Sequence, residues 1–156
     1  MKEKYDPIDQ FNSLLVEYMN TFNLLEGNVG SCIVFLEDSS REDSFQSLAK
    51  ANCVKKIEKL YKIVHLNNLL KSAKRLSELE KWCKNANQMR HRRNYYIHGV
   101  WSYIPHLDRV ELNVAPWFRQ GYDGSTKMTL QDFKVVVQEI KDCFHKLLEI
   151  RAKNGI

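Results

Sequence analysis

Residues 90–101 have the sequence RHRRNYYIHGVW, which gathers three arginines, two histidines and one asparagine in a short stretch. An arginine guanidinium binds phosphate oxygens bidentately and stabilises negative charge that develops on them. A histidine transfers protons near neutral pH, and an asparagine can orient a hydroxyl or a water. These are the groups that cleavage of a phosphodiester without a metal requires, and RNA already carries the attacking hydroxyl at its 2′ position.

The apolar spacing of residues 69–98 predicts that this stretch ends a long helix. At about 100° per residue, Arg90, Arg93 and Asn94 fall in the sector that the helix otherwise gives to apolar side chains. His98 lies at the edge of that sector, and Arg92, Tyr95 and Tyr96 point more nearly away from it. The apolar members of the sector are Leu79, Cys83, Ala86, Ile97 and, if the helix extends so far, Trp101.

Three explanations account for arginines at such positions, where removing one member of a buried ion pair costs about 3–5 kcal/mol. Arg90 and Arg93 could pair with carboxylates on neighbouring helices, for which Glu17, Glu26 and Glu139 are the candidates. They could line a groove or a dimer seam and be only half-buried. They could form a site for an anion, above all a phosphate, and the presence of a histidine on the same helix favours this third explanation.

The segment RNYYIH, residues 93–98, fits the pattern R-x(4–6)-H with a polar residue directly after the arginine. Its place late in a long helix, followed by Gly99 and Trp101, resembles the HEPN superfamily, including members that read RNxxxHGxW. The motif covers about a dozen residues, and the rest of the likeness is one of helical architecture. The resemblance implies that Arg93 stabilises the phosphate, that Asn94 assists and that His98 is the acid or base.

The resemblance also implies a function. Many HEPN proteins are metal-independent endoribonucleases that act as toxins or antiviral effectors, so we expect an RNA substrate, no cofactor and no metal. Because family sites form at a two-fold seam and this chain has one motif, a homodimer is implied, with an antitoxin or another protein as a further partner. We add Arg90, His91 and Tyr95 as substrate-binding candidates. The alternative is a non-catalytic helical module that binds a protein or a nucleic acid.

Four predicted helices must position these residues. The sequence predicts a mainly α, four-helix up-and-down bundle with an irregular insert between the third and fourth helices. The first helix starts at Asp6 and Pro7, and we favour its continuation to about residue 37 through Gly27 and Gly30, which would let another helix approach closely. The second and third helices are expected at 45–66 and 69–98. The insert is expected at 100–128, and the last helix at 130–152.

Two local patterns refine this scheme. The insert contains prolines, which forbid a long helix. It also contains the segments RVELNV and YDGSTKMT, which predict a short hairpin with an Asp-Gly turn. Thr129 and Asp132 form a predicted capping box that opens the last helix. Gly99 stands where a helix-terminating glycine belongs.

The whole chain has 156 residues, which suits one domain, and a net charge of +5, which favours an anionic partner. Its four cysteines are far apart and form no CxxC pair. His91 and His98 have no third ligand at a recognisable spacing, so a metal site is not predicted. The sequence shows neither a signal peptide nor an apolar stretch that could cross a membrane, and we expect a cytoplasmic protein.

Overall fold

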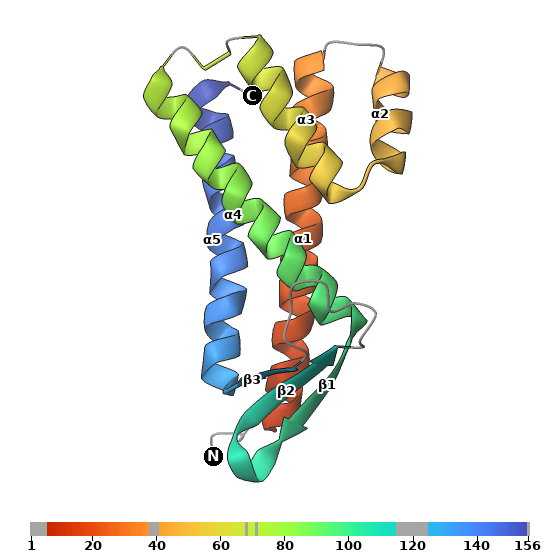
Figure 1. The fold of residues 1–156 in the computed structure, drawn as a ribbon, viewed down its shortest axis with the longest axis vertical. Coiled ribbons are helices and arrows are strands. Elements are labelled where there is room, and N and C mark those ends of the chain that lie inside the picture. Colours follow the sequence, from red (N-terminus) through yellow and green to blue (C-terminus); the bar gives the residue numbers. More distant parts are fainter. Residues whose placement is uncertain (1–5, 38–40, 68, 71, 115–124, 156) are drawn as a thin grey trace.

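The computed structural model describes residues 6–37, 41–67, 69–70, 72–114 and 125–155. In this part of the chain there are five α-helices and a three-stranded antiparallel sheet of order β1-β2-β3, which confirms the mainly α prediction (Figure 1). The elements are α1 (Pro7–Glu37), α2 (Arg41–Lys50), α3 (Cys53–Leu66), α4 (Ala73–His98), β1 (Gly99–Ile104), β2 (Arg109–Val114), β3 (Ser125–Met128) and α5 (Leu130–Asn154).

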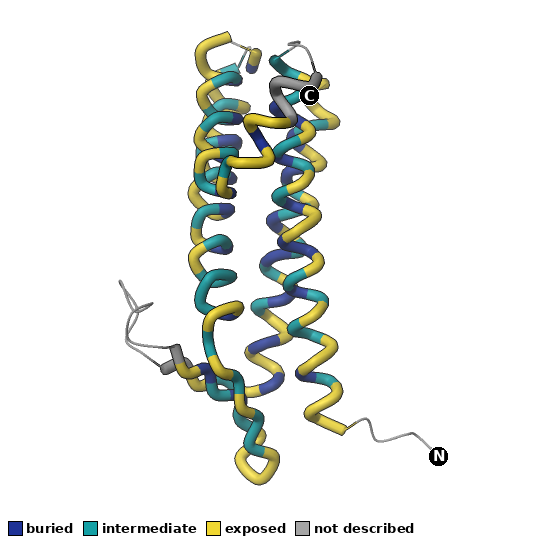
Figure 2. The backbone as a smooth tube through the Cα atoms, turned by 90° about the vertical axis from the view of Figure 1, so that its right-hand side faces the viewer, coloured by how far each residue is buried: buried dark blue, intermediate teal, exposed yellow. Residues whose placement is uncertain are grey.

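The long helices α1, α4 and α5 form the body of the molecule, and α3 packs against α1 and α4 (Figure 1). The sheet lies at the end where α1 begins and α4 ends. Buried residues face the interior along the whole length of the bundle, and exposed residues cover its outside (Figure 2). Among the described residues, no helix is both long enough and apolar enough to cross a membrane.

Helix α1 confirms the prediction of one continuous helix. Asp6 accepts a hydrogen bond from the backbone N–H of Ile8 at 2.9 Å, as expected of a helix cap. The helix passes through Gly27 and Gly30 without a break. The expected role of these glycines is wrong, however, because a Cβ atom at either position would meet nothing within 4 Å. Neither glycine therefore permits a close helix contact.

The single helix predicted for residues 45–66 is instead two helices, α2 and α3. The chain breaks at Asn52, whose extended backbone and side-chain Oδ1, which accepts from the N–H of Lys55 at 3.0 Å, cap α3. Asparagine side chains compete in this way with continued helix formation. The break places the N-terminus of α3 in the middle of the bundle, beside α1 and α4.

Helix α4 begins at Ala73 and ends at His98, as predicted at its C-terminal end, but its buried face is rotated from the expected one. The side chain of Ile97 is 37% exposed, whereas Tyr96, expected to point away, is 6% exposed. Trp101 belongs to β1. The buried positions of α4 are Leu79, Trp82, Ala86, Met89 and Tyr96.

The rotation has a physical cause in aromatic packing at the end of the bundle. The ring of Tyr96 lies 5.0 Å from that of Tyr18 and 5.1 Å from that of Trp101, measured between centroids. Tyr96 and Trp101 both also contact Phe133 of α5. These rings outweigh Ile97 in the apolar area they bury, so they set the orientation of the last turns of α4.

The two segments of the predicted hairpin pair with each other, because β2 is RVELNV and β3, which lies within YDGSTKMT, pairs with it antiparallel. β1 and β2 pair from Gly99↔Val114 to Ile104↔Arg109, and the chain reverses through the 3₁₀ turn Pro105–Leu107 and Asp108, which has a left-handed backbone with φ 41°. β3 adds to the other edge of β2. The predicted Asp-Gly turn, residues 123–124, lies outside the described residues.

Gly99 ends α4, but not as a left-handed cap, because its φ of −92° and ψ of 156° are those of an extended strand. Its lack of a side chain serves packing instead. A Cβ atom there would lie 2.1 Å from Cδ1 of Leu112 and 2.9 Å from the carbonyl oxygen of Tyr95. Gly99 therefore lets the end of α4 turn directly into the sheet.

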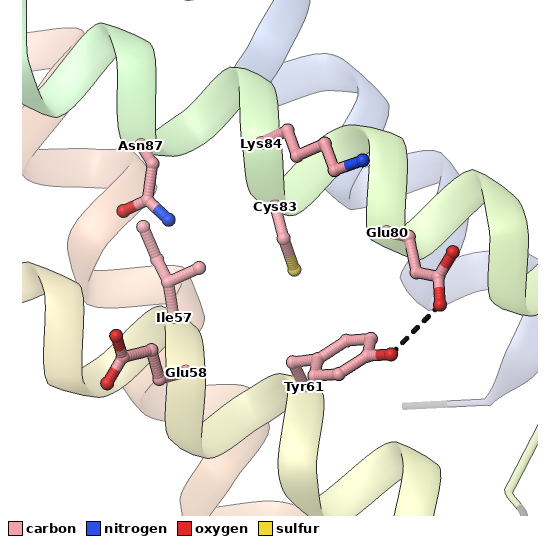
Figure 3. Close-up of a pocket in the computed structure, with 7 residues that line it drawn as sticks. All are labelled: Ile57, Glu58, Tyr61, Glu80, Cys83, Lys84 and Asn87. Carbon is pink, nitrogen blue, oxygen red and sulfur yellow. Dashed lines mark hydrogen bonds between the residues drawn. The ribbon is translucent and has the colours of Figure 1, made fainter.

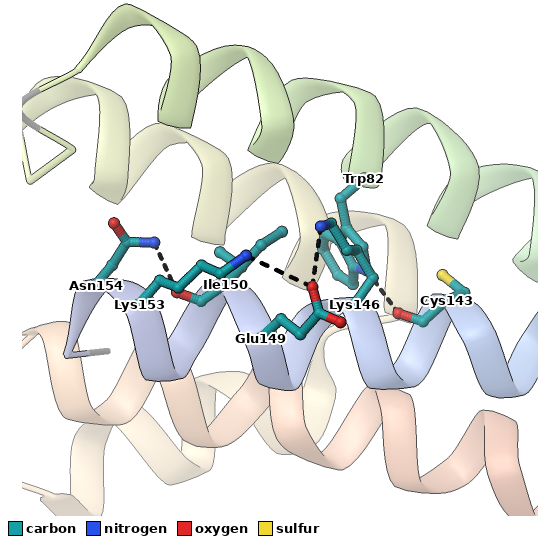
Figure 4. Close-up of polar contacts among 7 residues, drawn as sticks. All are labelled: Trp82, Cys143, Lys146, Glu149, Ile150, Lys153 and Asn154. Atoms are coloured by element: carbon teal, nitrogen blue, oxygen red, sulfur yellow. Dashed lines mark hydrogen bonds and ion pairs between the residues drawn. The ribbon is translucent and has the colours of Figure 1, made fainter.

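Helix α5 opens with the predicted capping box: Thr129 accepts from the N–H of Asp132, and the carboxylate of Asp132 accepts from the N–H of Thr129. Trp82 of α4 fixes α4 against α5, since its indole Nε1 donates to the carbonyl oxygen of Cys143 at 2.9 Å (Figure 4). The hydroxyl of Tyr18 ties α1 to α4 by donating to the carbonyl oxygen of Met89 at 3.1 Å.

Candidate functional site

Three of the predicted site residues, Arg90, Arg93 and Asn94, line one pocket of about 320 Å³. We call it the arginine pocket. It lies between α1, the first turn of α3 and the C-terminal half of α4. The remaining lining residues are Phe22, Glu26, Asn52, Cys53 and Val54.

In the part of the chain that the structure describes, Arg93 contacts an aromatic ring of α1 and has a single long hydrogen bond, to Asn94. The guanidinium carbon of Arg93 lies 5.5 Å from the centroid of the Phe22 ring, which is a cation–π contact. Its Nη1 lies 3.4 Å from Oδ1 of Asn94. The Nε atoms of Arg90 and Arg93 are both buried and have no hydrogen-bond partner among the described residues. A buried N–H without an acceptor costs about 1–3 kcal/mol, so both atoms favour an incoming acceptor.

The ion-pair explanation fails for the three carboxylates that the sequence suggested. Among the described residues, neither Arg90 nor Arg93 forms a salt bridge. The three carboxylates bind other cations: Glu17 binds Lys141 at 2.5 Å, Glu26 binds Lys56 at 2.6 Å, and Glu139 binds Arg92.

The N-terminus of α3 adds to the positive character of the pocket. Cys53 and Val54 are the first residues of α3, whose backbone N–H groups have no acceptor within the helix. The helix dipole places partial positive charge at this end. Glu26, the carboxylate in the pocket wall, is paired with Lys56 at 2.6 Å. The electrostatics of the pocket therefore suit an anion that offers several acceptor oxygens.

His98, the predicted acid or base, does not line the arginine pocket. It is the exposed last residue of α4. His98 is five positions after Arg93, which places it about 140° further around the helix axis. Asn94 lies one turn before His98 and belongs to the pocket wall. Within one chain, the structure thus joins Arg93 to Asn94 and leaves the imidazole of His98 outside their pocket.

His91, predicted to bind substrate, is coupled to the pocket through Arg90. Its Nε2 lies 2.6 Å from Nη2 of Arg90, and because a guanidinium only donates, the imidazole nitrogen accepts. Partial burial, and secondarily the charge of Arg90, lowers the pKa of His91. Tyr95 is half-buried, packs against the core and does not line the pocket. His91 is therefore a histidine in direct contact with an arginine of the pocket, an arrangement that the helical projection did not reveal.

Other lining residues were missed by sequence reasoning. Asn52 could have been found, because an asparagine ahead of an apolar helical pattern is a common N-cap. Phe22 carried no signal, since its spacing on α1 is that of an ordinary core residue. Its contact with Arg93 depends on how α1 and α4 pack.

The chemistry of the pocket does not use thiolate. Burial, followed by the charge of Glu26, raises the pKa of Cys53 to about 11, so the thiol in the pocket wall stays protonated at neutral pH. Among the described residues, no group of three or more histidines, cysteines and carboxylates could hold a metal ion.

Comparison with known proteins adds no relative to this description. No family model matches the sequence, and neither the curated proteins nor the solved structures contain a significant match. The likeness to HEPN proteins thus stays a prediction from residues 93–98 and their helix.

Proposed function

We propose that this protein is a metal-independent endoribonuclease that holds an RNA phosphodiester in the arginine pocket. The observation that carries the proposal is the state of Arg90 and Arg93, whose buried Nε atoms lack acceptors and whose charges lack carboxylate partners among the described residues. A phosphodiester supplies both the acceptor oxygens and the negative charge. The adjoining N-terminus of α3 stabilises the same charge.

The reaction follows from the groups present and from the 2′-hydroxyl of RNA. The 2′-oxygen attacks the adjacent phosphorus while a histidine accepts its proton. The bond from phosphorus to the 5′-oxygen breaks, and that oxygen takes up a proton as it leaves. The products are a 2′,3′-cyclic phosphate and a 5′-hydroxyl. Arg93 and Arg90 stabilise the charge that grows on the phosphoryl oxygens, and Asn94 aligns the reacting groups.

The position of His98 makes a homodimer part of the proposal. His98 is exposed at the end of α4 and lies outside the pocket of its own chain. In a two-fold assembly, the His98 of one copy can face the arginine pocket of the other. His91, bound to Arg90, is the alternative proton acceptor within a chain. A role as a toxin or antiviral effector in the cytoplasm, opposed by an antitoxin, belongs to the same proposal.

The test is cleavage of single-stranded RNA by purified protein in EDTA, with products analysed for cyclic phosphate ends. The parent is expected to cut, and Arg93→Ala and His98→Ala are expected to lose activity while they fold normally. His91→Ala separates the two histidines. Cleavage that appears only after Mg²⁺ is added, or that persists unchanged in both histidine variants, contradicts the proposed mechanism.

The rival function is RNA binding without chemistry, or protein binding through the same face of α4. One observation favours it: among the described residues, no histidine lines the arginine pocket. RNA binding alone predicts affinity that falls steeply with salt and no products. Protein binding predicts that Arg93→Ala leaves RNA affinity unchanged.

A further inference from the structure

A second pocket, of about 360 Å³, continues the arginine pocket along the groove between α3 and α4. We call it the tyrosine pocket. Three residues of α3 and four of α4 line it (Figure 3): Ile57, Glu58 and Tyr61, and Glu80, Cys83, Lys84 and Asn87. It lies in the region that the predicted motif leaves unused.

The two pockets follow one another because α3 and α4 run antiparallel along the groove. Residues 52–54 of α3 meet Arg90 and Arg93, and one turn further along α3, residues 57–61 meet the earlier residues of α4. From Arg93 back to Lys84 there are nine residues, or about 13 Å of helix. A short stretch of single-stranded RNA with one phosphate in the arginine pocket can reach the tyrosine pocket with a neighbouring base.

The tyrosine pocket has an aromatic wall and an excess of hydrogen-bond acceptors. The hydroxyl of Tyr61 donates to one oxygen of Glu80, Oε1, at 2.9 Å, and the carboxylate keeps its second oxygen for another donor (Figure 3). Oδ1 of Asn87 is buried and has no partner among the described residues. Lys84, one turn after Glu80, supplies a cation on the same side of α4. Burial raises the pKa of Cys83 to about 12, so the thiol is a neutral part of the wall.

We infer that the tyrosine pocket binds an RNA base next to the bound phosphate and selects guanine. Guanine presents two adjacent donors, N1–H and N2–H, to Glu80, whose Oε2 is open among the described residues and whose Oε1 can accept a second hydrogen bond beside that of Tyr61. The O6 of guanine accepts from Lys84. Adenine and cytosine present one donor beside an acceptor, and uracil presents one donor between two acceptors. Stacking on Tyr61 is open to every base, so the carboxylate and the lysine carry the selection. The inference rests on the proposed function in taking RNA as the occupant.

The test uses 2′-O-methyl hexanucleotides, which cannot be cleaved because the attacking hydroxyl is blocked. One oligonucleotide contains only adenine, and three others carry a single central guanine, cytosine or uracil. Fluorescence anisotropy is expected to show that the parent protein binds the guanine-containing oligonucleotide about tenfold or more tightly than the other three.

Two variants locate that preference. Glu80→Gln keeps the size of the side chain and an acceptor for Tyr61, and Lys84→Gln changes an exposed residue. Each is expected to reduce the preference for guanine to about twofold or less, with little change in binding of the all-adenine oligonucleotide. Glu78→Gln is the matched control, because it removes the same charge from α4 outside the pocket. It is expected to keep the full preference.

The outcomes separate this inference from the proposed nuclease. Equal binding of all four oligonucleotides by the parent overturns the guanine subsite, as does a preference that survives in both pocket variants. A preference that depends on Glu80 and Lys84, in a protein that does not cut RNA in EDTA, upholds the subsite and overturns the nuclease. If no oligonucleotide binds, the guanine subsite and the proposed nuclease are both contradicted.

Discussion

The arginines on the two sides of α4 have different polar partners. On the α5 side, Arg92 is paired with Glu139, and the indole N–H of Trp82 donates to the carbonyl oxygen of Cys143. On the α3 side, Arg90 and Arg93 have buried Nε atoms without acceptors, and no carboxylate among the described residues pairs with them. The three arginines lie within four residues of one helix. Their different surroundings therefore reflect the groove that each one faces.

This difference supports the proposal that the α3 side of α4 binds a ligand, whereas the α5 side holds the fold together. On the α5 side, the guanidinium of Arg92 and the indole N–H of Trp82 are satisfied by the protein itself, as is usual for polar groups in a fold. On the α3 side the protein leaves donors in the arginine pocket and an acceptor, Oδ1 of Asn87, in the tyrosine pocket. Among the described residues, three of the five buried polar side-chain atoms without a hydrogen-bond partner lie in these two adjoining pockets. This favours a polar ligand with both donors and acceptors, which a nucleotide has.

The largest effect on stability is expected on the α5 side. Trp82 is 3% exposed and joins α4 to α5 by packing and by one hydrogen bond. Trp82→Ala should lower the free energy of unfolding by about 3–5 kcal/mol, measured by urea denaturation. Trp82→Phe, which keeps most of the volume, should cost much less. A loss below about 1 kcal/mol for the alanine variant would show that this side does not hold the bundle together.

Arg93→Ala is expected to have the largest effect on function. Removing a group that stabilises developing charge lowers a reaction rate by about 100- to 1,000-fold, so RNA cleavage in EDTA should fall by that factor. The free energy of unfolding should change by less than about 1 kcal/mol, because no ion pair among the described residues is lost. Arg93→Lys keeps the charge but not the bidentate geometry and should recover only part of the activity.

The junction between α4 and the sheet gives the next effect. Gly99→Ala would bring its Cβ atom to 2.1 Å from Leu112 Cδ1 and 2.9 Å from the backbone oxygen of Tyr95. The neighbours must shift, so we expect unfolding to become easier by about 1–3 kcal/mol. Thermal melting measures this. A Gly27→Ala variant is the control, because a Cβ atom there meets nothing within 4 Å, and it should melt no earlier than the parent.

Arg92→Ala removes an arginine from the α5 side of α4, so it can be compared directly with Arg93→Ala on the α3 side. The side chains of Arg92 and Glu139 are 42% and 43% exposed, so their pair should contribute about 0.2–1 kcal/mol to stability. RNA affinity at fixed salt should stay within about twofold to threefold of the parent. A loss as large as that of Arg93→Ala would mean that RNA senses only the total charge of the helix.

The smallest effect concerns pH and His91. Because the fold lowers the pKa of His91 from its ordinary 6.5, the unfolded chain binds the proton more readily than the folded one. Stability contributed at this site is therefore complete above about pH 6.5 and decreases as the pH falls through the lowered value. His91→Ala should lose slightly less thermal stability than the parent between about pH 7.5 and 5.5. An identical loss in the two proteins would remove His91 from this account.

The sequence correctly predicted those helix ends that are capped by a nearby side chain. Asp6, and Thr129 with Asp132, cap the helices as their spacing indicates, because caps depend on a few neighbouring residues. The mainly α fold followed from apolar periodicity. The break at Asn52 was missed because the apolar pattern continues across it, while the backbone there leaves the helix.

The site was predictable in composition more than in geometry. Helical projection correctly grouped Arg90, Arg93 and Asn94, which line one pocket. It could not show that Phe22 and the N-terminus of α3 complete that pocket, since both come from other elements. It also put Ile97 inside and Tyr96 outside, because aromatic contacts between elements, invisible in one helix, orient the end of α4.

The most direct test of the central claim is binding of a 2′-O-methyl oligonucleotide by the parent and by the double variant Arg90→Gln/Arg93→Gln, with Arg92→Gln as the charge control. We predict that the double variant binds about 100-fold more weakly, shows a shallower dependence of affinity on salt and melts close to the parent temperature. Unchanged affinity in the double variant, joined to a large fall in its melting temperature, would show that these arginines stabilise the fold and bind no phosphate.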